Sequence, residues 1–289
     1  MRILGCLLVA TSLLWAADLP LSGIGHAAYL VSDLAKSDAF YRDVLGFERA
    51  FELKNAAGEV NLVYYKINDD QFVEIFPTLK PGQDERFSHV CLSTPDIERL
   101  HAMLRERGLN PPAIADGRDG TRRFVIQDPE GTRIEFQQYL PESAQRKARG
   151  VATPRRISAR LRHVGIKIKD EAAALAFYRD KLGFVETWRG GPEGGPVRWI
   201  NLRMPGGSGD YLELMLYDTP PTKAQLGSMH HICLEVDEIQ KPWAELKARG
   251  VPDVDRHRPR IGRNQRWLLN LFDADGTRTE LMEPRTTNR

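Results

Sequence analysis

Residues 23–47 read GIGHAAYLVSDLAKSDAFYRDVLGF, and residues 160–184 read RLRHVGIKIKDEAAALAFYRDKLGF. Both stretches place a histidine in an alternating strand pattern, followed by an acidic residue, a helix containing AFYRD, and a closing LGF. The chain is therefore an internal duplication. A shorter version of the pattern recurs in residues 87–109 and 229–251. The unit thus occurs four times, starting at His26, His89, His163 and His231.

Each unit is predicted to fold as βαβββ. The alternation around His26 indicates a strand, and Asp33 is a suitable N-cap for the helix that follows. Gly46 suits the left-handed position after that helix. Three strands follow, and tight turns at residues 128–131 and 273–276 join the last two strands of a unit. The sequence therefore predicts an α+β fold of four βαβββ units.

Length and composition bound the function. The chain has 289 residues, 42% hydrophobic and 28% charged, with a formal net charge of +2. This small charge gives no indication of a nucleic-acid partner or a membrane surface. Basic residues gather between Arg146 and Arg162, which we interpret as a solvated linker. The expected organisation is a first module over residues 22–140, a linker over 141–159 and a second module over 160–285.

The N-terminal residues 1–17 have the features of a secretory signal. Arg2 precedes an apolar run that ends in small residues near Ala17. The run is too short to span a bilayer as a mature helix. We expect a periplasmic or secreted protein, or a cytoplasmic one if the segment is instead a helix packed on the core. Cys91 and Cys233 occupy matching repeat positions, so a disulfide between them is not expected.

Alternation along the strands places ionisable residues on one face of each sheet. Glu74, for example, opposes Val73 and Ile75, which should pack against the helices. The first-half residues on the opposite face are His26, Glu74, His89 and Glu135, and the second-half residues are His163, Glu213, His231 and Glu280. A solvated sheet face would explain any one of these residues. The order His, Glu, His, Glu, found twice, instead favours a site for a divalent metal such as Ni, Co, Zn, Mn or Fe(II).

The histidine-initiated strand, the FYRD-x-LGF helix end and the hairpins DPEGTRIEF and DADGTRTEL resemble the vicinal oxygen chelate superfamily. This family includes glyoxalase I, extradiol dioxygenases and bleomycin-resistance proteins. The resemblance covers about residues 23–140 and 160–285. It implies that paired units curl into open cups with helices outside, and that the eight residues above are metal ligands. Ligands could be paired within one module or between modules.

The resemblance also implies a reaction. Two His and two Glu look most like a glyoxalase-like lyase or isomerase, whose small substrate chelates the metal through adjacent oxygens. Glu135 and Glu280 are then the candidate catalytic bases. One alternative is an Fe(II)-dependent extradiol-type dioxygenase, for which His257 and Tyr217 are the nearest candidates for the extra catalytic groups. Another is an exported small-molecule-binding protein without turnover. A monomer or a homodimer is expected.

The two cups are not expected to be chemically equal. The second half has Lys167, Glu235 and Arg278 where the first has Leu30, Ser93 and Arg133. One site could therefore be vestigial. Cys91 and Cys233 should share the cup face with the ligands, where they are better explained as small apolar fillers than as soft ligands. His230, next to His231, should point away from the cup.

Overall fold

The computed structural model describes residues 17–252 and 254–287. The expected signal segment, apart from Ala17, lies outside the described residues. Among the residues that are described, no helix combines the length and the apolar character needed to cross a bilayer.

The first module is an eight-stranded mixed sheet in the order β2-β3-β4-β1-β5-β8-β7-β6. Its strands are β1 (Gly23–Leu30), β2 (Glu48–Lys54), β3 (Val60–Lys66), β4 (Phe72–Phe76), β5 (Phe87–Ser93), β6 (Ala115–Asp116), β7 (Thr121–Gln127) and β8 (Arg133–Tyr139). Its helical segments are α1 (Leu34–Asp38), the π-helix η1 (Ala39–Val44) and α2 (Ile97–Glu106). The short segments α3 (Ala144–Lys147) and η2 (Ala148–Gly150) follow the sheet.

The second module repeats this architecture, with the strand order β10-β11-β12-β9-β13-β16-β15-β14. Its strands are β9 (Leu161–Ile168), β10 (Val185–Gly190), β11 (Trp199–Arg203), β12 (Tyr211–Leu216), β13 (Ile232–Glu235), β14 (Arg260–Ile261), β15 (Trp267–Phe272) and β16 (Arg278–Met282). Its helical segments are α4 (Glu171–Leu175), η3 (Ala176–Lys181), α5 (Lys223–Met229), α6 (Gln240–Ala248) and η4 (Val254–His257). The predicted four βαβββ units are confirmed, and α5 is an addition between the third and fourth.

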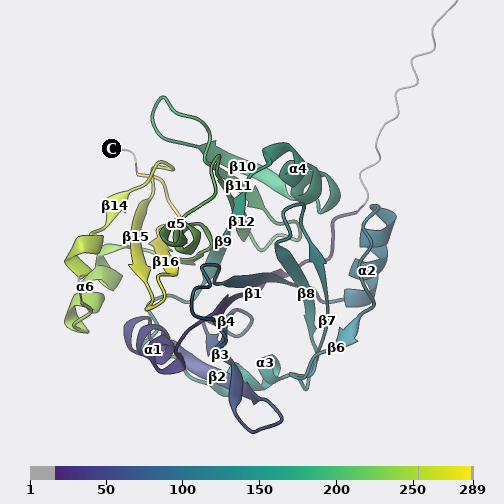
Figure 1. The fold of residues 1–289 in the computed structure, drawn as a ribbon, viewed down its shortest axis with the longest axis horizontal. Helices are drawn as coiled ribbons and strands as arrows, with labels where there is room; N and C mark the ends of the chain where they lie inside the picture. The colour runs from purple at the N-terminus through teal and green to yellow at the C-terminus, as the bar shows by residue number, and fades with distance from the viewer. Residues whose placement is uncertain (1–16, 253, 288–289) are drawn as a thin grey trace, which may run out of the picture.

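Local sequence explains the first helix of each module. The Asp33 carboxylate accepts hydrogen bonds from the N–H groups of Ala35 and Lys36, and Gly46 has a φ of 72° after the helix. The AFYRD segment adopts a π-helix rather than a continuous α-helix. In Figure 1, α2 and α6 lie at the periphery of the molecule, with the strands between them.

The order of the central strands places the ligand positions in the middle of each sheet. β1 runs parallel to β4 and antiparallel to β5, and β5 runs parallel to β8. Four adjacent strands, β4-β1-β5-β8, therefore supply the four expected ligands of the first module. The second module does the same with β12, β9, β13 and β16. The candidate ligands thus come together within a module rather than between modules.

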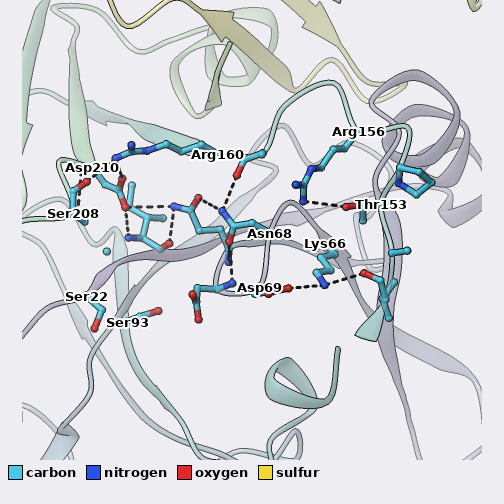
Figure 2. A pocket seen from close by; sticks show the side chains of 18 residues that line it. Ser22, Lys66, Asn68, Asp69, Ser93, Thr153, Arg156, Arg160, Ser208 and Asp210 are labelled. Atoms are coloured by element: carbon cyan, nitrogen blue, oxygen red, sulfur yellow. Dashed lines mark hydrogen bonds and ion pairs between the residues drawn. The ribbon is translucent and has the colours of Figure 1, made fainter. Parts of the chain in front are cut away.

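Two buried polar side chains, Gln71 and Asp210, which we call the clamp, join the two modules. Gln71, immediately before β4, forms two hydrogen bonds with the backbone of Leu161 in β9, each 2.9 Å long. Asp210, immediately before β12, accepts a 3.1 Å hydrogen bond from the backbone N–H of Ile24 in β1. Both side chains are buried, and Figure 2 shows Asp210 beside Arg160, with which it forms an ion pair. Each module therefore holds the first strand of the other.

The tight turns make a second reciprocal contact. Glu130, in the last turn of the first module, accepts hydrogen bonds from the backbone N–H groups of Lys169 and Asp170 at the start of α4. Asp275, in the corresponding turn of the second module, accepts from the N–H and hydroxyl of Ser32 before α1. Each of the two acidic turns thus binds residues just before the first helix of the other module.

We expect Gln71→Ala to destabilise the whole chain by about 1–3 kcal/mol, because it leaves the buried N–H and C=O of Leu161 without partners. Urea unfolding followed by circular dichroism measures the change. Gln127→Ala, the same substitution at an exposed strand end, should change stability little. Equal effects from the two substitutions would show that the clamp contributes nothing specific.

Candidate metal centre

The four predicted ligands of the first module meet at one point. His26 Nε2 lies 3.1 Å from His89 Nε2 and 3.2 Å from both Glu74 Oε2 and Glu135 Oε2. His89 Nε2 lies 3.0 Å from Glu74 Oε2 and 3.3 Å from Glu135 Oε2. All four side chains are buried. The cup face is therefore not a solvated sheet surface at these positions.

These separations fit a bound divalent metal. Ligand atoms about 2.0–2.2 Å from a metal lie roughly 3–3.5 Å from one another. The buried Oε2 of Glu74 has no hydrogen-bond partner, and it lies beside two imidazole Nε2 atoms, as expected for ligands that share a cation. His26, Glu74 and His89 are close enough to hold one metal ion, and His26 and Glu135 form another such group with Cys91.

Opposite charges within the cluster stabilise each other. Burial alone would raise the pKa of Glu74, but the positive charges of His26 and His89 lower it to about 2. Burial alone would lower the pKa of His89, but Glu135 and Glu74 raise it. The raised pKa of both histidines favours their protonated form beside the two carboxylates.

Neighbouring side chains fix the ligands in place. Arg123 donates a 2.8 Å hydrogen bond to Oε1 of Glu135, the oxygen that does not face the histidines. The ring of Tyr64 packs edge-on against His26, with centroids 5.3 Å apart. Cys91 is buried beside the cluster, and desolvation raises the pKa of its thiol to about 12. Cys91 also lies close enough to His26 and Glu135 to share a metal with them, so its interpretation as a filler stays a prediction.

A cavity of about 350 Å³ opens onto this cluster. Of the four ligands, Glu74 and His89 line it. The remaining wall combines apolar side chains, three arginines and three other polar residues: Leu30, Leu53, Leu62, Tyr64 and Phe76; Arg118, Arg123 and Arg133; and Thr78, Ser88 and Asp119. This is room for a small molecule, with positive charge around it.

The second set also comes together, but less tightly. His163 Nε2 and His231 Nε2 lie 3.0 Å apart. Glu213 Oε2 lies 3.8 Å from His163 and 3.5 Å from His231, and Glu280 Oε2 lies 3.8 Å from His231. The guanidinium of Arg278 enters this cluster and lies 2.9 Å from His231 Nε2.

The pKa shifts in the second cluster are opposite in direction to those in the first. Burial and the charge of Arg278 lower the pKa of His231 well below its ordinary value. Burial and the neighbouring Glu280 raise the pKa of Glu213 to about 8. The histidines are thus neutral, because Arg278 already supplies a positive charge.

Other residues weighed from the sequence lie elsewhere. His257 packs against Phe272, and the Tyr217 hydroxyl donates to Glu130 in the contact between modules, so neither lies in a cup. Lys167 binds Glu85. His230 packs on Phe87, as expected for a side chain that points away from the cup.

A cavity of about 840 Å³ lies between the modules and the linker rather than at either cluster. Many of the polar residues that line it are bound to one another or to the backbone (Figure 2). Lys66, for example, donates to the carbonyls of Ala148, Arg149 and Val151. Lys66 therefore joins β3 to the segment that follows the first sheet (Figure 2).

Sequence reasoning did not single out Arg123 and Tyr64, which support the first cluster. Their positions carry a signal that could have identified them. Arg123 lies on β7 and Tyr64 on β3, strands that neighbour the ligand strands β8 and β4, and both have side chains on the ligand face.

A family model described as the Glyoxalase/Bleomycin resistance protein/Dioxygenase superfamily matches residues 23–136 and 160–281. The chain belongs to this superfamily. The two matched ranges correspond to the two modules, so the resemblance noted from the sequence is confirmed for both halves.

Members of the superfamily with different activities are similar to this chain. The ethylmalonyl-CoA/methylmalonyl-CoA epimerase of Cereibacter sphaeroides is 33% identical over 125 residues, which covers 40% of this chain and 90% of the epimerase. The lactoylglutathione lyase of Schizosaccharomyces pombe is 22% identical over 277 residues, which covers 81% of this chain and 88% of the lyase.

Solved structures show the same fold across both modules. The 2,3-dioxygenase LapB from Pseudomonas sp. KL28 superposes with a TM-score of 0.66 at 19% identity, covering 92% of this chain and 93% of LapB. At this identity, the likeness concerns the arrangement of the strands and helices.

Metal affinity of the first cluster should rise with pH. A metal binds neutral imidazole, and the raised pKa of His89 means that a proton must leave first. Below that pKa the proton competes with the metal, and above it the competition ends. We expect Ni²⁺ affinity to increase by about tenfold per pH unit for each proton displaced, measured by calorimetric titration from pH 6.5 to 8.5. Affinity that is constant over this range would contradict the proton-filled cluster.

Proposed function

We propose that the first module is the active site of a divalent-metal-dependent enzyme, a glyoxalase-like lyase or isomerase. The observation that supports this most directly is the convergence of His26, Glu74, His89 and Glu135, of which Glu74 and His89 line a cavity. The proposed substrate is a small molecule with adjacent oxygens that reach the metal, which would be Ni, Co, Zn, Mn or Fe(II). Export from the cytoplasm is part of the same proposal.

A bound metal would polarise a substrate carbonyl and make the neighbouring C–H more acidic. The protein's own residues would then accept and return the proton. The apolar wall of the cavity would exclude water from the substrate, and the arginines around it would favour a substrate with negative charge.

Two carboxylates compete for the role of base. Glu135 is the base predicted from the resemblance, and Arg123 fixes one of its oxygens. Glu74 lines the cavity. We propose Glu135 as the base, with Arg123 orienting its carboxylate. This proposal assigns no metal and no catalytic role to the second module, for which the sequence predicts a metal held by His163, Glu213, His231 and Glu280, with Glu280 as the base.

The alternative functions receive less support. An extradiol-type dioxygenase would need further catalytic groups near the metal, and the two candidates from the sequence, His257 and Tyr217, lie outside both cups. A non-catalytic binding protein would need the cavity but not four converging ligands.

Replacement of the base should reduce turnover without loss of metal. Glu135→Gln keeps an oxygen that can coordinate but cannot accept a proton, so we expect kcat to fall by about 10²–10⁴-fold at unchanged metal content. Glu74→Gln is the matched control. Steady-state kinetics and elemental analysis of both variants make the comparison, and a larger loss for Glu74→Gln would transfer the role of base to Glu74.

The reaction class can be tested by proton exchange. Two of the relatives are named for lactoylglutathione and methylmalonyl-CoA, and each of these compounds carries a proton next to a carbonyl. We expect metal-dependent exchange of such a proton with deuterated water, followed by NMR, for a substrate of this type. A catechol provides the contrasting case, because a dioxygenase would consume oxygen with it. Metal-dependent oxygen uptake without proton exchange would exclude the lyase or isomerase proposal.

A further inference from the structure

In the second cup, the guanidinium of Arg278 supplies a positive charge. Arg278 begins β16 at the position that Arg133 occupies in β8, as shown by their pairing with Phe272 and Gln127 in the neighbouring strands. Arg133 is exposed, whereas Arg278 turns inward to His231. Equivalent arginines therefore take different positions in the two cups.

Neighbouring residues account for this difference. Tyr64, which packs against His26 in the first cup, is replaced in the second cup by Asn201, since these residues pair with Glu74 and Glu213 respectively. The shorter side chain leaves room beside the histidines. Arg123, which binds Glu135, is likewise replaced by Leu268.

The second cluster does not fit a metal as well as the first. Arg278 Nη2 lies 2.8 Å from Nδ1 and 2.9 Å from Nε2 of His231, so the guanidinium is within hydrogen-bonding distance of both ring nitrogens. Nδ1 also lies 3.0 Å from the carbonyl oxygen of Met229. A metal bound at His231 Nε2 would therefore meet a guanidinium that stays charged.

The cavity above Arg278 has a distinct chemistry. It has a volume of about 310 Å³, and its wall includes the indoles of Trp188 and Trp199 and the side chain of Leu268. Three arginines, Arg260, Arg263 and Arg278, also line it, together with two glutamates, Glu213 and Glu280. The guanidinium groups outnumber the carboxyl groups, and with the two indoles they suit an aromatic ring that bears an anionic group.

Arg278 has hydrogen-bonding capacity left over. Its Nε is buried and has no partner, and its Nη1 is 3.8 Å from Glu280, beyond hydrogen-bonding distance. A guanidinium offers five N–H donors in a planar fork that matches a carboxylate. Donors left unpaired in a partly buried site are costly, so an anionic ligand would be favoured there.

We propose that the second cup binds a small aromatic carboxylate without a metal, with the guanidinium of Arg278 in the place that the metal takes in the first cup. The ring would lie against Trp188 and Trp199. The cavity volume is near the lower end of the roughly 300–1,000 Å³ range of ligand sites, which suits a single ring. This proposal does not depend on the activity proposed for the first module.

Benzoate is the probe, and benzamide, its neutral analogue, is the matched ligand control. Titration of the full chain loaded with Ni²⁺, followed by tryptophan fluorescence and calorimetry, should show saturable binding of benzoate and at least tenfold weaker binding of benzamide. Arg278→Leu should weaken benzoate binding by about 10- to 100-fold, because it removes a charge-assisted contact. Arg278→Lys keeps the charge but loses the fork, and should also weaken binding.

Variants of the first cup separate the two sites. His89→Ala should remove metal but leave benzoate binding intact, and Arg133→Leu should leave it unchanged. The wild-type chain should bind one Ni²⁺, and His231→Ala should still bind one. The proposal is overturned if benzoate does not bind, if Arg278→Leu binds it as well as wild type does, or if His231→Ala lowers the Ni²⁺ content from two to one.

Discussion

The antiparallel pairing of β1 with β5, and of β9 with β13, is the constraint on which both cups depend. Within each βαβββ unit the first and last strands are parallel neighbours, so a unit alone brings one histidine and one glutamate together. Pairing two units through their first strands places all four ligand strands side by side. A shift of this register by one residue would turn His89 out of the cup. The metal cluster is therefore a product of backbone hydrogen bonding at the centre of the sheet.

Burial of four ionisable groups within about 3 Å of one another is tolerable only if positive charge balances the carboxylates. The two modules meet this requirement differently. In the first, protonated histidines or a metal provide the charge, and Arg123 adds to it at the edge. In the second, Arg278 provides positive charge; burial and Arg278 lower the pKa of His231, while burial and Glu280 raise the pKa of Glu213. Small differences at neighbouring positions, such as Tyr64 and Asn201, distinguish these two solutions.

Much of the fold and of the ligand sets could be predicted from the sequence, because the repeats and the two-residue period of the strands are local patterns. The pairing of ligands within a module could not, since it depends on contacts between strands distant in the sequence. The orientation of the Arg278 side chain could not be predicted from the sequence either. The sequence shows an arginine at both Arg133 and Arg278, and only the packing around each shows which of them enters the cluster. The supporting role of Arg123 was not predicted, because Arg123 lies on β7, a neighbour of the ligand strand β8.

The inward turn of Arg278 has a consequence for how the duplicated halves relate to their surroundings. A metal in the first cup would be taken up from solution, so its presence would vary with supply, with chelators and with acidity. A guanidinium is part of the chain and cannot dissociate from it. The first half would thus respond to the inorganic composition of its environment, and the second half would not. The duplicated chain would combine one centre that is conditional with another that is permanent.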